Sequence, residues 1–192
     1  MELLFTLPHF NQLYEVMKFI SYPDLIKIRY LDRDIYYFCK SNRLVQALFI
    51  KGETDKFIRD NNNDLFYAFI ASCDQARLEI VDELIKRGVN PSNNSDQVLH
   101  NLSRNGKLRI IERLLQDERV DPSCNDNLPI RLASFYGKLD IVDRLLKDPR
   151  VDPVDSIQLA SNNKHYAVVQ RLLQDPRVIS TERERGYFSR NK

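Results

Sequence analysis

The distribution of apolar positions in the second half of the chain predicts short amphipathic helices. Leu108, Ile110, Ile111, Leu114 and Leu115 stand at positions i, i+2, i+3, i+6 and i+7, which share one broad face of a helix. Residues 139–146 repeat this spacing of apolar side chains. A helix this short is not stable by itself, so each one is expected to bury its apolar face against a neighbour.

The same segment recurs four times, at residues 77–92, 107–123, 138–153 and 165–178. Pro91, Pro122 and Pro153 follow one another at intervals of 31 residues, and the last copy comes after a shorter step of 27. A second helical segment precedes each of the last three copies: VLHNLSRNG, PIRLASFYG and SIQLASNNK. Pairs of short helices at a fixed period predict an all-α solenoid of about four repeats, in which each pair contacts its neighbours.

Glycine, proline and aspartate indicate where these helices end and begin. Gly88 can adopt the left-handed conformation that follows a helix. Pro149 and Pro176 disfavour a helical conformation in the residue before them, Asp148 and Asp175, and the RVDP stretch that follows such a helix is expected to run extended. Asp155 is expected to cap the helix that begins at Ser156.

The first 69 residues have a different composition, because they hold 14 of the 19 phenylalanine and tyrosine residues. Apolar spacing over residues 13–20 predicts a helix that stops before Pro23, and Asp24 can cap the next one. The turn-forming cluster at residues 61–64 marks the junction with the repeats. We therefore expect a three-helix unit at 1–42, a helical bridge at 43–63, repeats at 64–180 and a polar tail at 181–192.

Composition, net charge and the absence of certain motifs argue against several classes of fold and function. Five glycines and eight prolines are few for a fold rich in tight β-turns, which favours helices. A net charge of +2 and the absence of a long apolar segment argue against nucleic-acid binding, membrane insertion and secretion, so a cytoplasmic monomer is expected. No phosphate loop, nucleophile motif or metal-ligand spacing is present, so neither a cofactor, a metal nor an enzymatic activity is expected.

The segment LPIRLASFYGKLDIVDRLLKDPRVDP resembles the ankyrin repeat, and the resemblance extends over roughly residues 64–180. It implies a turn followed by two antiparallel helices in each repeat, and binding of a protein target as the function. The Asp-Pro-Arg-Val-Asp-Pro variant is similar to the ankyrin repeats that giant DNA viruses encode, which implies a host protein as the target and the host cytoplasm as the location.

Candidate target-binding residues lie at the turn tips and at the open ends of the first helices, where solenoids form long binding surfaces. Phe135 and Tyr136 are the sharpest candidates, because two adjacent aromatic side chains cannot both face one core; one of them filling a gap between helices is the alternative. The full set is Asn93, Asn94, Arg104, Asn105, Asn125, Asp126, Phe135, Tyr136, Asp155, Asn162 and Asn163.

The N-terminal part resembles the F-box, because Leu-Pro at residues 7–8 precedes VMKFISYPDLIKIRYLDRDIYYFC at residues 16–39. That family binds the Skp-type adaptor of cullin-RING ubiquitin ligases, so the resemblance implies recruitment of the ligase to a target held by the repeats. The corresponding adaptor-binding residues are Leu7, Pro8, Ile20, Tyr22 and Leu25. The alternative is a plain ankyrin-type scaffold whose first helices only cap the apolar end of the array.

Overall fold

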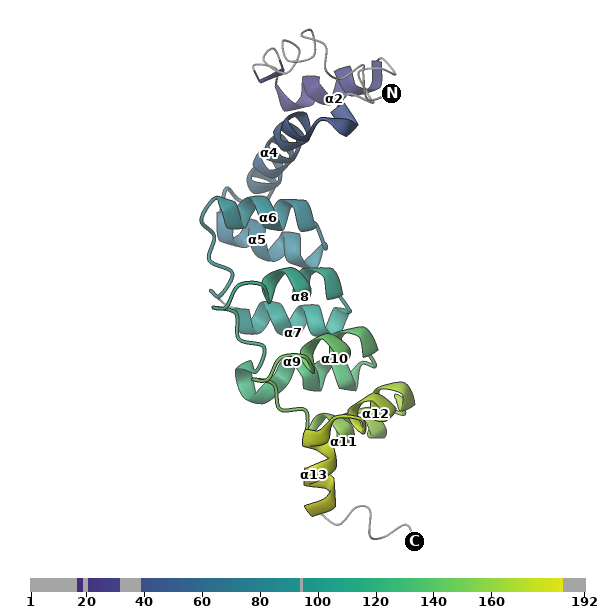
Figure 1. Cartoon of the computed structure of the whole chain (residues 1–192). Helices are drawn as coiled ribbons and strands as arrows, with labels where there is room; N and C mark the ends of the chain where they lie inside the picture. Colours follow the sequence, from purple (N-terminus) through teal and green to yellow (C-terminus); the bar gives the residue numbers. More distant parts are fainter. Residues whose placement is uncertain (1–16, 19–20, 32–38, 94, 185–192) are drawn as a thin grey trace. The chain divides into compact units, whose positions relative to one another are not determined.

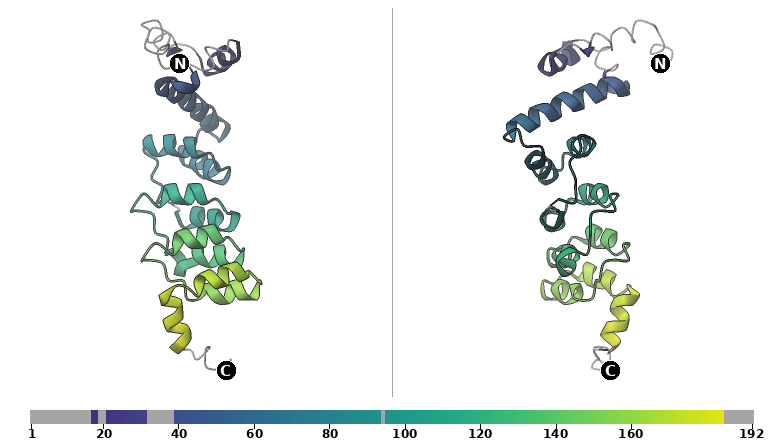
Figure 2. Two further views of the ribbon diagram at one scale, coloured as in Figure 1. Left: turned by 45° about the vertical axis from the view of Figure 1, so that its right-hand side comes forward. Right: turned by 90° about the vertical axis from the view of Figure 1, so that its left-hand side faces the viewer.

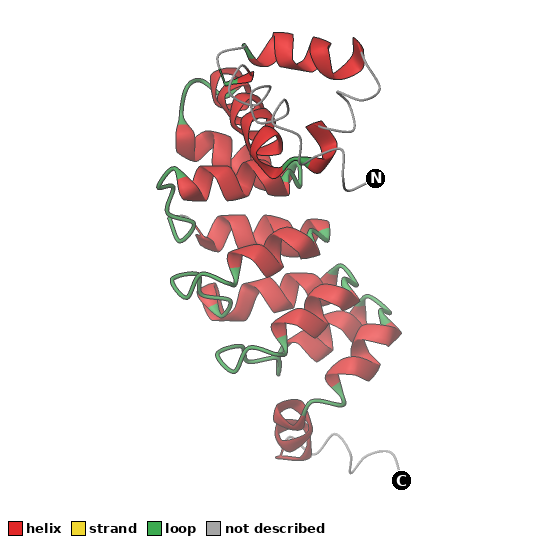
Figure 3. Ribbon diagram, turned by 45° about the horizontal axis from the view of Figure 1, so that its top comes forward, coloured by secondary structure: helices red, strands yellow, loops and turns green. Residues whose placement is uncertain are grey.

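The computed structural model describes residues 17–18, 21–31, 39–93 and 95–184. All regular elements in these ranges are helices, which confirms the all-α prediction (Figure 3). The chain divides into two compact units, one formed by Met1–Ala71 with Glu79–Val89 and the other by Ser72–Leu78 with Asn90–Lys192.

The first unit contains α2 (Tyr22–Leu31) and the long helix α4 (Arg43–Asp60), which occupies the predicted bridge. Asn42 begins α4 by accepting the backbone N–H groups of Leu44 and Val45. The two helices approach closely, because a Cβ atom at Gly52 would lie 2.5 Å from the ring of Tyr22. Tyr22 also meets Phe49 edge to face, with ring centroids 6.5 Å apart. Helix α2 is therefore seated on α4 by an aromatic side chain over a glycine.

The predicted turn at residues 61–64 connects α4 to α5 (Leu65–Asp74). Asn62 and Asn63 adopt left-handed conformations, which asparagine tolerates better than most residues. The carboxylate of Asp64 then accepts the backbone N–H groups of Phe66 and Tyr67 at 2.8 and 2.9 Å. This cap starts the first helix of the repeats at the position that the sequence predicts.

The first unit also contains α6 (Leu78–Lys86) from Glu79 onward. Arg87 follows it and forms ion pairs with Asp55 of α4 at 2.6 Å and with Glu83 of its own helix at 3.1 Å. The next residue, Gly88, has a φ of +95°, which is the left-handed conformation predicted for the end of this helix. An ion pair therefore joins the second helix of the first repeat to the bridge helix.

The second unit stacks three helix pairs in two layers. One layer holds α7, α9 and α11, and the other holds α8, α10 and α12 (Figures 1 and 2). Their bounds are α7 (Ser95–Asn105), α8 (Leu108–Leu114), α9 (Cys124–Phe135), α10 (Leu139–Leu145), α11 (Ser156–Asn162) and α12 (Tyr166–Leu172). With α5 and α6, the described residues contain four helix pairs, as the predicted all-α solenoid of about four repeats requires.

The repeated apolar stripe forms the core of this stack. Ile110, Ile111 and Leu114 of α8 are fully buried, as are the three corresponding side chains of α10 and, in α12, Val168 and Leu172. Burial of one such aliphatic side chain is worth about 1.5–3 kcal/mol. Because helices of seven residues are marginal in isolation, packing between neighbouring pairs stabilises them more than helix propensity does.

The turns between paired helices have one recurring geometry. Gly106, Gly137 and Lys164 occupy equivalent places and all have positive φ, between 60° and 76°. A Cβ atom at Gly137 would lie 2.6 Å from the ring of His165, and one at Gly106 would lie 3.4 Å from Cδ of Lys138. A side chain from each pair thus lies across the turn of the pair before it, which fixes the register of the turns.

The end of the array departs from the sequence prediction. The stretch after Pro176 is helical, and α13 (Pro176–Glu184) crosses the expected start of the polar tail. Proline suits the first position of a helix because its φ is already helical. In the preceding repeat Asp152 and Pro153 follow the valine and stop a helix, whereas Ile179 and Ser180 follow Val178 here. The helix therefore continues.

Candidate functional site

The turns between paired helices of the second unit form one continuous side of the stack. We call this side, made of residues 104–109, 135–140 and 162–166, the turn edge. The loops that join one pair to the next lie on the opposite side, as Figure 1 shows. The turn edge contains six of the predicted target-binding residues.

Phe135 and Tyr136 lie where α9 ends and are exposed at 39% and 40%. Their rings meet edge to face, with centroids 4.9 Å apart. Neither residue is buried in the core. Two exposed and mutually packed aromatic side chains give a rigid apolar surface on the turn edge.

Contacts extend this aromatic pair to the neighbouring repeats on both sides. The guanidinium carbon of Arg104 lies 5.8 Å from the centre of the Tyr136 ring, within the range of a cation–π interaction. On the other side, Nε2 of His165 lies 2.9 Å from the carbonyl oxygen of Phe135. A carbonyl oxygen only accepts, so Nε2 carries the proton and donates it. One row of contacts therefore crosses three helix pairs.

Sequence reasoning missed His165 and Tyr166 as members of this surface. Tyr166 begins α12 and is 67% exposed. The repeat alignment carries a signal, because Tyr166 takes the place of Leu108 and Leu139 at the start of the second helix. An aromatic residue at a position that is aliphatic in the two preceding repeats indicates that the side chain contributes to the surface of this repeat.

The turn edge is rich in positive charge. The structure shows no salt bridge for its five cations within the described ranges: Arg104, Lys107, Arg109, Lys138 and Lys164. The one acidic residue of this edge is Asp140, which is exposed. These cations are therefore available to a negatively charged partner.

The predicted asparagines of the turn edge are exposed but have different surroundings. The side chain of Asn162 accepts a hydrogen bond from Gln158 at 2.7 Å, and that of Asn163 donates to the carbonyl oxygen of Leu159 at 2.8 Å. Both side chains are thus turned toward their own helix. Asn105 is exposed at the end of α7.

The opposite side of the stack carries a repeated aspartate–arginine turn, which we call the clasp. It is formed by the pairs Asp117–Arg119, Asp148–Arg150 and Asp175–Arg177. In each clasp the aspartate accepts the backbone N–H of the arginine and two N–H groups of its guanidinium. The valine that follows donates its N–H to the aspartate carbonyl and closes the turn.

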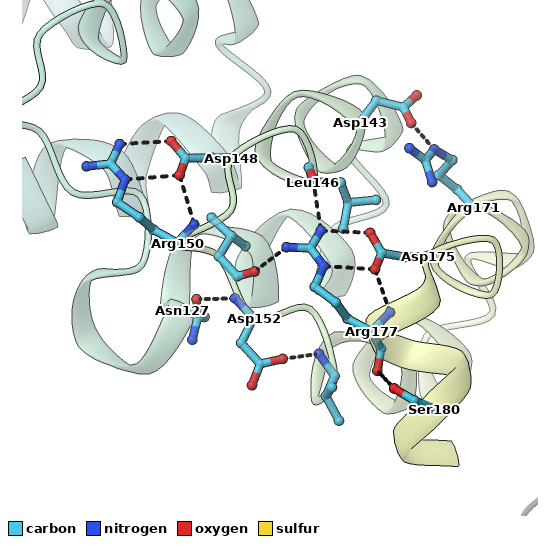
Figure 4. Close-up of polar contacts among 12 residues, drawn as sticks. Asn127, Asp143, Leu146, Asp148, Arg150, Asp152, Arg171, Asp175, Arg177 and Ser180 are labelled. Carbon is cyan, nitrogen blue, oxygen red and sulfur yellow. Dashed lines mark hydrogen bonds and ion pairs between the residues drawn. The ribbon is translucent and has the colours of Figure 1, made fainter. Parts of the chain in front are cut away.

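Two of the clasps also bind the preceding repeat, and Figure 4 shows this for Arg177. Arg150 donates to the carbonyl oxygen of Val120 at 3.3 Å. Arg177 donates to the carbonyl oxygens of Val151 at 2.7 Å and Leu146 at 2.9 Å. The clasps therefore satisfy backbone acceptors between repeats, and their arginines are occupied in the structure itself.

The clasps change the acidity of their carboxyl groups. Hydrogen bonds from the Arg119 side chain lower the pKa of Asp117 to about 2. Hydrogen bonds from the arginine side chains likewise lower the pKa of Asp148 and of Asp175. These carboxylates stay ionised at neutral pH, which suits a structural role.

The start of α9 holds two predicted tip residues in an unexpected, non-helical conformation. Asn125, Asp126 and Asn127 are three successive left-handed residues. Oδ1 of Asn127 accepts the backbone N–H of Asp152 from the next loop at 2.8 Å. A cavity of about 360 Å³ opens here, lined by Asp126, Asn127, Arg131, Asp152 and Asp155.

The remaining predicted residues are placed as follows. Asp155 precedes α11 but makes no side-chain capping hydrogen bond, so its predicted capping role is wrong; its backbone is already helical rather than extended. Asn93 is exposed, and Asn94 lies outside the described residues. Leu7, Pro8 and Ile20 of the F-box-like set also lie outside them, whereas Tyr22 packs on α4 and Leu25 is buried.

No group of three or more potential metal ligands occurs among the described side chains. Cys39, Cys73 and Cys124 are buried and form no disulfide. Burial raises the pKa of Cys73 to about 12, so this thiol is protonated at neutral pH and is a poor nucleophile. None of the described helices has the length and apolar character needed to cross a bilayer.

We predict that the clasps make the fold acid-sensitive. Aspartates of the unfolded chain have pKa values of about 3.9, which are higher than the pKa values of the clasp aspartates in the folded chain. On acidification below about pH 4 the aspartates of the unfolded chain therefore take up protons before the clasp aspartates do. The free energy of unfolding should fall as the pH drops toward 2, which is about the pKa of Asp117 in the folded chain.

The test is chemical denaturation at several pH values of the variant Asp117→Asn/Asp148→Asn/Asp175→Asn. It should be less stable than the parent at pH 7 and lose less stability on acidification, while Asp140→Asn, which has no clasp partner, should follow the parent. Equal acid dependence of parent and triple variant would contradict the role of the clasps.

Comparison with known proteins gives one family. No curated protein matches the sequence of the chain. Residues 68–157 match the family model of ankyrin repeats, in three copies. This range contains most of α5 and all of α6 to α10, and it includes Phe135, Tyr136 and Arg104. Ankyrin repeats are typically non-enzymatic and serve protein–protein interaction, so residues 68–157 form an ankyrin-repeat interaction scaffold.

Proposed function

We propose that the chain is a non-catalytic adaptor that holds a protein target on the second unit, with the Phe135–Tyr136 pair at the centre of the contact. The observation that carries this proposal is the exposure of both rings on the turn edge. Aromatic side chains that are rigid before binding lose little conformational freedom in a complex, and they are frequent energetic centres of interfaces.

The other exposed candidates extend the proposed surface. Arg104 and Asn105 precede the aromatic pair by one repeat, and Asn162 and Asn163 follow it by one. Asp126 and Asp155 line the cavity on the opposite side of the stack and offer a second, acidic contact region. Binding of this kind raises the effective concentration of the target near any other protein that the chain holds.

The test of target binding begins with capture of proteins on the full chain from an extract of its source cells, or of host cells if the source is a virus. A captured protein is then purified and titrated by calorimetry. Phe135→Ala/Tyr136→Ala should weaken its affinity by about thirtyfold, the loss of roughly 2 kcal/mol that is typical at an interface centre. Tyr67→Ala, another exposed aromatic residue outside the second unit, is the matched control and should leave the affinity within about twofold.

Failure of every captured protein to saturate the purified chain would overturn the scaffold proposal. Equal affinity for the parent and the double variant would remove the aromatic pair from the interface.

For the N-terminal helices we propose recruitment of a Skp-type ubiquitin-ligase adaptor, and the F-box-like pattern that includes Leu7 and Pro8 supports this. A different observation supports the capping alternative. Leu25 is buried, and the Tyr22 ring is packed over Gly52 of α4, so both residues take part in the fold of the first unit. Adaptor binding through the Tyr22 side chain would require α2 to leave α4.

Two measurements on the full chain separate these roles. Alanine normally stabilises a helix interior by about 1 kcal/mol relative to glycine. Gly52→Ala should instead lower the free energy of unfolding, because its Cβ meets the Tyr22 ring; a stabilised variant would show that α2 is not seated on α4.

A purified Skp-type adaptor is titrated in parallel. Saturable binding that Leu7→Ala/Pro8→Ala abolishes would support recruitment, and no binding to the parent chain would leave capping as the role.

A further inference from the structure

Charge is distributed unevenly between the two sides of the second unit. On the side of the clasps, Arg119, Arg150 and Arg177 are each paired with an aspartate. On the turn edge, the five cations named above have no salt bridge within the part of the chain that the structure describes. Folding therefore uses the arginines of one side and leaves the cations of the other side for an external partner.

The unpaired cations stand in register with the exposed rings. Lys107 and Lys138 are equivalent residues that immediately precede α8 and α10. Tyr136 lies two residues before Lys138 and reaches back to Arg104 of the preceding pair. The turn edge thus presents positive charge, an aromatic surface and positive charge again in successive repeats.

We propose that the turn edge binds an extended, acidic segment of a partner protein, with an apolar side chain of that segment on the Phe135–Tyr136 pair. The carboxylates of the segment pair with Arg104, Lys107 and Lys138. This inference rests on the proposed scaffold function and specifies the chemistry of its partner.

The repeat spacing determines the pattern of the segment. Neighbouring helices pack about 8–10 Å apart, so equivalent lysines of successive pairs are separated by about one such step. A peptide in the polyproline II conformation advances about 3.1 Å per residue and completes one turn in three residues, so every third side chain lies about one such step further along the same side. Acidic residues at every third position, with leucine or phenylalanine between them, match the turn edge best.

The same geometry disfavours a nucleic acid as the occupant. Single strands bind where successive bases stack on open aromatic faces inside a strongly basic groove. Here Arg104 lies over a face of Tyr136, and the two adjacent rings pack against each other edge to face. The whole chain carries a net charge of only +2. An apolar side chain flanked by carboxylates fits the exposed ring surface and the separated cations better.

Binding of synthetic probes to the full chain, followed by fluorescence anisotropy, tests the proposal. The probe is a labelled peptide of about 13 residues that repeats Asp-Leu-Ser, a length that spans about four repeat steps. One comparison peptide has the same composition with its aspartates grouped at one end, and another has lysine in place of aspartate. A single-stranded oligonucleotide and vesicles with anionic lipid represent the other classes of occupant.

The expected result is saturable binding of the spaced acidic peptide, weaker at higher salt. Lys107→Glu/Lys138→Glu should weaken it by about tenfold or more, since two attractive ion pairs become repulsive. Lys147→Glu/Lys86→Glu is the matched control, because it makes the same change of net charge at exposed lysines outside the turn edge, and it should bind like the parent. Thermal unfolding confirms that each variant is folded, and the salt dependence of the parent tests the charge requirement without any substitution.

The inference would be overturned if the spaced acidic peptide did not bind, or if both lysine variants lost affinity for it equally. Equal affinity for the grouped peptide, or tighter binding of the oligonucleotide or the vesicles, would also contradict it. Self-association of the chain that depends on Lys107 and Lys138 would replace the partner segment with a second copy. The scaffold proposal can be tested separately from this inference. A captured target that requires Phe135 and Tyr136 but not the two lysines would support the scaffold and contradict the acidic segment.

Discussion

Burial of an apolar stripe between successive helix pairs is the constraint on which the second unit depends. Its second helices have only seven residues, which is too few for a stable helix in water, and three side chains of α8 (Ile110, Ile111 and Leu114) are nevertheless fully buried. Each pair can bury this stripe only against its neighbours. The same packing brings equivalent turns into line, so a surface feature of one repeat continues in the next.

The two sides of this stack differ in how their polar side chains are used. On one side, the clasps close their turns and donate to backbone carbonyl oxygens of the preceding repeat, as Arg177 does to Leu146 and Val151. On the other side, the short turns depend on left-handed residues and close packing, as at Gly137 beneath His165. Within the described residues the cations of the turn edge form no salt bridge and its aromatic pair stays exposed, and this supports the proposed use of the turn edge as a binding surface.

The sequence predicted the parts of the fold that follow from periodicity. A 31-residue repeat with apolar side chains at helical spacing led to the solenoid, and the cluster at residues 61–64 gave the start of α5. Features that depend on contacts between repeats were not predictable in this way. The partners of Arg150 and Arg177 lie about one repeat away along the chain, and the exposure of Tyr136 depends on what the next pair covers. Helix α13 was missed because the prediction followed the repeat pattern beyond the point where Asp-Pro is replaced by Ile-Ser.

The central claim is that stacking holds the turn edge as a rigid row with a fixed spacing. The most direct test is the distance between spin labels at Lys107→Cys and Tyr166→Cys, measured by pulsed electron resonance in a chain whose Cys39, Cys73 and Cys124 are replaced by alanine. These positions belong to helix pairs two steps apart, so the account predicts one narrow distribution centred near about 20 Å, allowing for the labels. A broad distribution, or a maximum beyond about 30 Å, would contradict it.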